Sequence, residues 1–189
     1  MITIITAFTN LFGRGGAPLA SIKMGEKRED IAEKILGNCF CSLVISSVII
    51  MLILLFFGDK ILLLFGASEN TLPYAMDYMR IYSLGTVFVQ LSVGLNYFIN
   101  TQGYAKYGML TLLIGGILNI ILDPIFIFVL HMDVAGAAIA TVISQFVSCV
   151  WVMKFLLGKK TTIKIKKEHL KLDLDIMKKV LGLGFSPFL

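Results

Sequence analysis

Charged residues are scarce in this sequence of 189 residues. They make up 15% of the chain, against about 25% in a typical soluble domain, while apolar residues make up 57% and mean hydropathy is +0.87. With only two histidines, three cysteines and four prolines, the chain has few residues for catalysis or metal binding and few helix breakers. This composition argues against a water-soluble enzyme, a disordered chain and a nucleic-acid-binding protein.

The charges that are present leave four long gaps. Residues 35–58, 81–105 and 134–153 carry no Asp, Glu, Lys or Arg, and residues 107–132 carry only Asp123. A helix needs about 20 mostly apolar residues to cross the roughly 30 Å of hydrocarbon in a bilayer, and it satisfies its own backbone hydrogen bonds. The gaps therefore predict an all-α, polytopic transmembrane helix bundle. Its partial N-terminal lobe would cover residues 1–157, with complete spans near 35–58, 81–105, 107–130 and 134–157.

Both ends of the chain carry shorter apolar stretches. Residues 1–12 are too short to cross a bilayer and lack the basic start of a signal peptide, so they predict the end of a partial span. Residues 180–189 predict the start of the next membrane helix, joined to the rest by a basic linker at 158–179. Asp173 or Asp175 is placed to cap that helix. We therefore expect an internal piece of a larger membrane protein.

Lysine and arginine are distributed unevenly along such a bundle. Segments 13–34, 101–106 and 154–179 hold 15 of the 17 basic residues, and the alternate segments 58–80 and 131–133 hold two. Basic residues accumulate on the cytoplasmic side of membrane proteins and are attracted to anionic inner-leaflet lipid. We expect those three segments to be cytoplasmic in a multi-pass protein of the cell membrane. Membrane lipid, and not nucleic acid, then accounts for the positive charge.

Asp123 is the only acidic residue inside a predicted span. Placing Asp at the centre of a membrane helix costs about 2.5–3.5 kcal/mol, so such a residue usually faces a cavity or a partner. Asn119 lies on the same helix face one turn earlier, and Pro124, which has no N–H, frees the carbonyl of Ile120. Carboxylate, amide and carbonyl oxygens suit Na⁺, and a carboxyl in a low dielectric can instead accept a proton.

These residues predict a binding site for a coupling ion, Na⁺ or H⁺, and no cofactor or other metal site. The alternative is that Asn119 and Asp123 only hydrogen-bond neighbouring helices. The next window opens with small residues spaced for close helix packing, including Gly136 and Ala140 four residues apart. Close approach of the two helices would bring the Thr141 hydroxyl beside Asp123. Alternatively, that hydroxyl bonds only its own helix backbone.

Several strings in the sequence resemble one family of membrane transporters. GGILNIILDPIFIF, followed by GAAIATVISQ, resembles the fifth and sixth helices of the multidrug and toxic compound extrusion (MATE) transporters. Residues 13–34 resemble that family's loop between its second and third helices, and LLLFGAS with YAMDYMRIYSLG resembles the entry to its fourth. The resemblance implies a twelve-helix transporter of two six-helix lobes, of which this chain is most of the first.

The resemblance also carries expectations about the site and the partner lobe. It implies that Asn119, Asp123 and Thr141 bind the coupling cation and that Asn96 is a polar residue near them. The family's first helix and its whole second lobe are absent from this sequence. We therefore expect the missing second lobe to be a partner and this chain to be inactive alone.

The leading functional expectation is a secondary antiporter, in which Na⁺ or H⁺ drives efflux of amphipathic or cationic compounds. Two alternatives stay open: a lipid-linked oligosaccharide flippase of the same superfamily and a non-transporting membrane subunit. A flippase would favour a cationic cavity, yet the four charge-poor windows contain no Lys or Arg. An enzyme is not expected, because no nucleophile–base pair or metal cluster occurs. Tyr82, spaced by four residues from Tyr78, predicts either an interfacial aromatic stripe or a wall of the substrate cavity.

Overall fold

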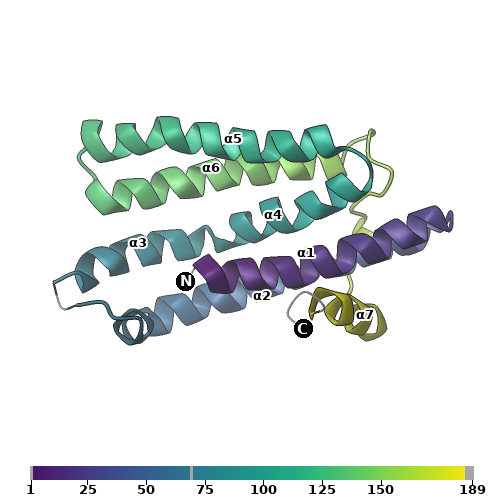
Figure 1. Ribbon diagram of the computed structural model, residues 1–189, viewed down its shortest axis with the longest axis horizontal. Helices are drawn as coiled ribbons and strands as arrows, with labels where there is room; N and C mark the ends of the chain where they lie inside the picture. The colour runs from purple at the N-terminus through teal and green to yellow at the C-terminus, as the bar shows by residue number, and fades with distance from the viewer. Residues whose placement is uncertain (1, 69, 186–189) are drawn as a thin grey trace.

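The chain folds as a bundle of helices that run alongside one another (Figure 1). The computed structural model of the protein describes residues 2–68 and 70–185, and all the regular elements in that part of the chain are helical. The helices are α1 (Ile2–Gly25), α2 (Glu29–Leu64), α3 (Leu72–Leu84), α4 (Thr86–Thr101), α5 (Ala105–Pro124), α6 (Asp133–Leu156) and α7 (Leu174–Phe185), with a π-helical turn η1 (Ile125–Val129) and a 3₁₀ turn η2 (Lys167–His169). The predicted all-α fold is confirmed.

Three helical stretches in the described residues are long and apolar enough to cross a membrane, judged by length and composition: Glu29–Leu64, Ala105–Val129 and Asp133–Leu156. Only 33%, 6% and 39% of their most apolar windows is buried within the chain. The α5 stretch therefore leaves most of its apolar side chains exposed or only partly buried. Such surfaces are stable in lipid or against another protein surface, because contact of so much apolar surface with water is unfavourable.

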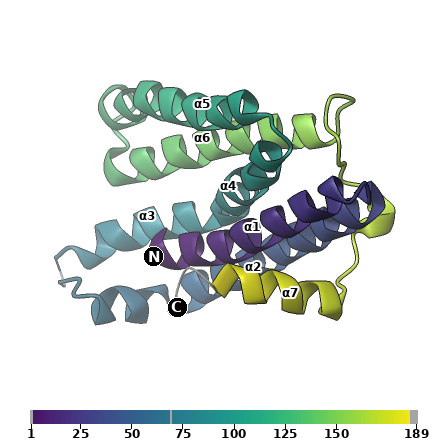
Figure 2. The same ribbon diagram turned by 45° about the vertical axis from the view of Figure 1, so that its right-hand side comes forward.

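The predicted span at 81–105 is divided in the structure. Helix α3 begins earlier, at Leu72, and Gly85 separates it from α4, which ends at Thr101. The two helices have 13 and 16 residues, and Figure 2 shows the change of direction between them. A Cβ atom on Gly85 would lie 2.6 Å from Val142 Cγ2 on α6, so glycine lets the break pack closely against α6.

The boundaries near the two ends of the chain also differ from the prediction. The first helix does not stop at residue 12 but continues to Gly25, so Arg14 belongs to a helix and not to a loop. Residues 13–20 are rich in glycine and alanine, which lower hydropathy yet allow close helix packing. Helix α7 begins at Leu174, six residues before the expected start. Asp173 Oδ1 accepts the backbone N–H of Asp175 at 2.9 Å, which confirms the predicted cap.

The main core lies between α1, α2 and α4, and α6 and α7 close it. Ile35, Leu36, Leu95 and Phe98 are among its large, fully buried side chains. Figure 2 shows α5 and α6 as a pair on one side of α4, with α1, α2 and α7 on the other. The turns between α1 and α2 and between α4 and α5 lie at the same end of the bundle as the linker after α6 (Figure 1). The three basic segments therefore gather at that end.

Candidate cation-binding site

Asn119, Asp123 and Thr141 come together where α5 faces α6. Asn119 Nδ2 donates a hydrogen bond to Asp123 Oδ1 at 2.9 Å and a longer one to Thr141 Oγ1 at 3.4 Å. The Thr141 hydroxyl donates to the carbonyl of Ala137 at 2.9 Å, so a lone pair of its oxygen can accept from the Asn119 amide. All three side chains are half-buried. The structure thus groups the three residues that the sequence singled out.

Glycines let the helices of the site approach closely. A Cβ atom on Gly115 of α5 would lie 2.7 Å from Ser148 Oγ on α6. A Cβ atom on Gly136 of α6 would lie 2.8 Å from the carbonyl oxygen of Phe126 in η1. These distances are shorter than real Cβ contacts, so the two glycines are needed for the spacing observed. The predicted close packing is present, although Gly136 meets the π-turn and not α5 itself.

Pro124 marks the change from α-helical to π-helical hydrogen bonding beside the site. Helix α5 ends at Pro124, and the N–H of Leu130 then donates to the carbonyl of Ile125, five residues earlier, at 2.9 Å. Because Pro124 has no N–H, the carbonyl of Ile120 loses its α-helical donor. The Ile120 side chain itself is 73% exposed, so only its carbonyl can serve the site. Sequence reasoning missed the π-turn, and Pro124 was its only signal.

The electrostatics of the site favour a cation. In residues 2–68 and 70–185 no ion pair includes Asp123, whose carboxylate is balanced only by the Asn119 amide. The carboxylate lies beside Pro124, where α5 passes directly into the π-turn η1. Carboxylate, amide, hydroxyl and free carbonyl oxygens are the ligands that hard cations prefer. The arrangement can therefore hold a small cation or a proton.

A small cavity whose lining includes several polar side chains lies one helical turn from this group. It has a volume of about 60 Å³ and is lined by residues that include Ser92 of α4, Gly115 of α5 and Gln145 of α6. The Ser92 hydroxyl donates to Gln145 Oε1 at 2.9 Å. Gly115 lies four residues before Asn119 on α5, and Gln145 lies four residues after Thr141 on α6. Residues four apart share a helix face, so the cavity continues the polar face of the site. A water molecule needs roughly 10–15 Å³, so water fits there. Sequence reasoning missed this cavity. Its signal in the sequence was two polar residues, Ser92 and Gln145, in charge-free windows.

Two of the predicted supporting residues lie elsewhere. Asn96 is buried between α4 and α5, where its Nδ2 donates to the carbonyl of Gly108 at 3.2 Å. Gly108 precedes Asn119 by eleven residues, which is about 16 Å along a helix. Tyr82 is buried in a separate apolar cluster with Met79 and stacks on Tyr78 at 5.7 Å between ring centroids. The structure does not bring Asn96 to Asp123, and it places Tyr82, for which an interfacial stripe or a cavity wall was predicted, in a buried apolar cluster.

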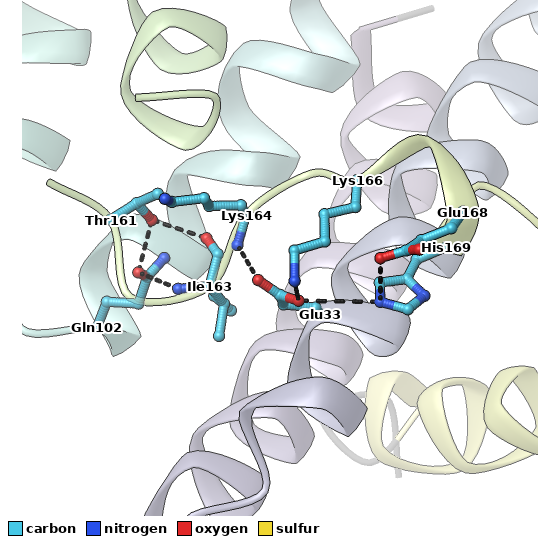
Figure 3. Close-up of polar contacts among 8 residues, drawn as sticks. All are labelled: Glu33, Gln102, Thr161, Ile163, Lys164, Lys166, Glu168 and His169. Carbon is cyan, nitrogen blue, oxygen red and sulfur yellow. Dashed lines mark hydrogen bonds and ion pairs between the residues drawn. The ribbon is translucent and has the colours of Figure 1, made fainter. Parts of the chain in front are cut away.

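The linker between α6 and α7 is fixed to the end of α4 by one amide side chain (Figure 3). Gln102 Oε1 accepts hydrogen bonds from the Thr161 hydroxyl at 2.7 Å and from the backbone N–H groups of Thr162 at 2.8 Å and Ile163 at 3.2 Å. Thr161 and Ile163 are buried. Sequence reasoning did not predict this attachment, because a glutamine at a helix end has no distinctive pattern.

The same linker is fixed to α2 by a buried carboxylate (Figure 3). Glu33 is 6% exposed, forms an ion pair with Lys166, and accepts the backbone N–H of Lys164 at 3.2 Å. His169 Nε2 lies 3.8 Å from the same carboxylate. The hydrogen bond with Glu33 raises the pKa of Lys166 above its ordinary value. The basic linker is thus part of the packed structure and not a free tether.

A family model described as MatE matches residues 1–125 of this chain. The chain belongs to the MatE family. It is 34% identical over all 189 residues to the multidrug export protein MepA of Staphylococcus haemolyticus (strain JCSC1435), and 26% identical to that of Staphylococcus aureus (strain MSSA476). In both comparisons the MatE chain spans 42% of the relative's length.

Solved structures agree with this membership. A structure described as the inward-facing conformation of a multidrug resistance MATE family transporter of the MOP superfamily matches with a TM-score of 0.90 and 26% identity, over 96% of this chain and 41% of that one. The outward-facing conformation matches with a TM-score of 0.88 and 27% identity, over 96% and 40%. The predicted transmembrane MATE-type bundle is confirmed. The prediction that the MatE chain is not an enzyme is confirmed by the family to which it belongs.

Proposed function

We propose that this MatE chain forms most of the first lobe of a multidrug efflux transporter in the cell membrane. It would bind the coupling ion, Na⁺ or H⁺, and the full protein would export amphipathic or cationic compounds in exchange for it. The observation that carries the proposal is the carboxylate of Asp123, half-buried in an apolar helix with an amide and a hydroxyl beside it and no basic partner among the described residues. The name of the matched relatives, multidrug export protein, supports the substrate class.

Coupling of ion movement to export would follow from binding and release of Na⁺ or H⁺ at Asp123. With Asp123 ionised, Asn119 donates to it and keeps its own Oδ1 free to join the Asp123 and Thr141 oxygens around Na⁺. With Asp123 protonated, the carboxyl becomes a donor, and the Asn119 amide can turn to accept. In either case the ion shifts the transporter only to the extent that it binds one conformation better than the other. Moving a population from 1:99 to 99:1 requires a difference in affinity of about 10⁴-fold.

The decisive test is Asp123→Asn in the full-length protein. Efflux of a cationic dye from cells should fall to the level of cells without the transporter, because the neutral amide can neither bind Na⁺ strongly nor take a proton. Asp59→Asn, which neutralises an exposed acid at the far end of α2, is the matched control and should keep normal efflux. Expression and membrane insertion should be equal in all three proteins. Normal efflux by Asp123→Asn would reject the proposal.

The ion can be identified in vesicles that contain the full-length protein. A Na⁺ gradient and a pH gradient are imposed separately, and dye transport is followed in each case. The gradient that drives transport identifies the ion, and Asp123→Asn should abolish that response. Failure of both gradients to drive transport would contradict an antiporter. A flippase is not favoured, because the charge-poor windows offer no Lys or Arg to bind a lipid-linked anion.

A further inference from the structure

A second, larger pocket lies at the basic end of the bundle, where the start of α5 meets the end of α6 and the beginning of the linker. Its volume is about 300 Å³, at the lower end of the range of roughly 300–1,000 Å³ that is typical of small-ligand sites. Its walls are three aromatic side chains and three lysines: Tyr107, Trp151 and Phe155, and Lys154, Lys159 and Lys160. No carboxylate is among its lining residues in the described part of the chain.

Contacts among the wall residues hold this pocket in shape. The Tyr107 ring stacks on Trp151, with centroids 6.1 Å apart, and lies 4.8 Å from the ring of Phe155. Lys160 Nζ donates to the Tyr107 hydroxyl at 3.2 Å and lies 5.9 Å from the ring centroid. The Tyr104 hydroxyl donates to the carbonyl of Lys160 at 2.7 Å and fixes the linker backbone there. A pocket that is already formed loses little entropy when a ligand binds.

The lysines of the pocket have no carboxylate partner among the described residues. In the part of the chain that the structure describes, no Asp or Glu forms an ion pair with Lys154, Lys159 or Lys160, whereas Lys23 and Lys166 both have carboxylate partners. Three ammonium groups around one cavity repel one another, and an anion between them relieves that repulsion. The chemistry of the pocket is therefore that of a phosphate-binding site with an aromatic wall.

The position of the pocket favours a lipid as the source of the phosphate. Helices α5 and α6 are both long and apolar enough to span a membrane, and the pocket lies at one end of each. Exposed apolar side chains follow within about a turn, including Leu110 at 39% and Val150 at 49% exposure. A phospholipid whose headgroup occupies the pocket can lay its acyl chains along these surfaces.

We propose that this pocket binds the phosphate of an anionic phospholipid of the inner leaflet. Lys154, Lys159 and Lys160 hold the phosphate, and Tyr107 and Trp151 lie at the level of the headgroup, as interfacial aromatic residues do. The proposal uses the orientation in which the basic end is cytoplasmic. The lipid proposal does not depend on the role of Asp123, so the two proposals are tested by separate measurements and either can fail without the other.

Trp151 provides the readout, because it is the only tryptophan in the 189 residues. The full-length protein is reconstituted in vesicles that contain equal fractions of acyl-brominated phosphatidylglycerol or acyl-brominated phosphatidylcholine, and bromine quenching of tryptophan emission is titrated. Trp151→Phe supplies the background from any tryptophan elsewhere in the longer protein. We expect the anionic lipid to bind at least about fivefold more tightly than the zwitterionic one. Equal quenching by the two lipids would overturn the proposal.

Charge variants separate a built site from general attraction to an anionic surface. Replacing Lys154, Lys159 and Lys160 with Gln should abolish the preference for phosphatidylglycerol. Replacing the same residues with Arg should keep it, which shows that the fold tolerates change there. Replacing the exposed Lys171, Lys178 and Lys179 with Gln removes the same charge elsewhere on the chain and should leave the preference intact.

Two results would count against the lipid site, one from the glutamine variants and one from competition with a soluble anion. Equal loss of preference in the two glutamine triples would mean surface attraction only. Sodium phosphate, added at the ionic strength of a sodium chloride control, should not reduce the preference. If phosphate alone displaces the brominated lipid, the site is one for a free anion and the lipid assignment is wrong.

Discussion

Asp123 is held in an apolar helix by a neutral neighbour and not by a counter-charge. Its insertion costs about 2.5–3.5 kcal/mol, and a hydrogen bond to a charged group contributes about 1.5–3 kcal/mol. The 2.9 Å bond from Asn119 therefore offsets most of the cost, while the 3.4 Å contact of Asn119 with Thr141 adds little. The carboxylate thus has a hydrogen-bond partner without a lysine or arginine, and it stays available to an ion.

Thr141 should contribute to ion affinity through one oxygen. Thr141→Ala in the full-length protein should raise the Na⁺ or H⁺ concentration for half-maximal efflux about 2–10-fold, the effect of losing one ordinary polar contact. Thr141→Ser keeps the hydroxyl and should behave like the parent. Ser144→Ala is the matched control, because that buried hydroxyl donates to the carbonyl of Ala140 within its own helix. The role given to Thr141 is wrong if Thr141→Ala and Ser144→Ala have the same ion dependence.

At the scale of elements, the packing of α6 against η1 depends on glycine at residue 136, whereas Gly116 of α5 has open space beside it. Gly136→Ala places a Cβ atom 2.8 Å from a backbone oxygen of η1, which cannot move as a side chain would. We expect the free energy of unfolding to fall by about 1–3 kcal/mol. Gly116→Ala meets no atom within 4 Å and should be neutral or raise it by about 0.5–1 kcal/mol. Unfolding in a denaturing detergent measures both, and equal effects would contradict the packing described.

The linker should lose its attachment to α2 when Glu33 becomes neutral. Glu33→Gln weakens its contacts with Lys166 and His169, so amide hydrogen exchange over 160–169 should accelerate and the free energy of unfolding should fall by about 1–3 kcal/mol. Glu168→Gln neutralises a neighbouring acid whose side chain is 69% exposed, and it should change either quantity little. Unchanged exchange in Glu33→Gln would mean that Gln102 and apolar packing alone hold the linker.

At the scale of the whole molecule, the basic segments gather at one end of the bundle, which predicts its orientation. Cys39, Cys41 and Cys149 are first replaced with Ala, and a single cysteine is introduced by Ser68→Cys or Lys167→Cys. In intact cells a membrane-impermeant maleimide should label Ser68→Cys only, because residue 68 lies between α2 and α3 at the opposite end. Lys167→Cys should be labelled only after the cells are made permeable. The reverse pattern would overturn the orientation.

Much of the fold was predictable because hydropathy and helical period are local properties. The charge-poor windows identified the membrane-length helices, and the four-residue spacing of Asn119 and Asp123 put both on one helix face. The division at Gly85 and the continuation of α1 beyond residue 12 were not predictable in this way. Both depend on small residues that pack against another helix, and a hydropathy window does not register such contacts.

The amino-acid sequence by itself determined the helical class, the side of the bundle that carries the basic residues, and the isolated carboxylate with its amide neighbour. These follow from composition and from spacing within single helices. Only the tertiary structure decided that Thr141 reaches Asn119, that Asn96 and Tyr82 do not, that Glu33 and Gln102 hold the linker, and that three lysines surround an aromatic pocket. Each of these joins residues far apart in the chain, so it depends on which helix faces pack together, and spacing within one helix carries no information about that.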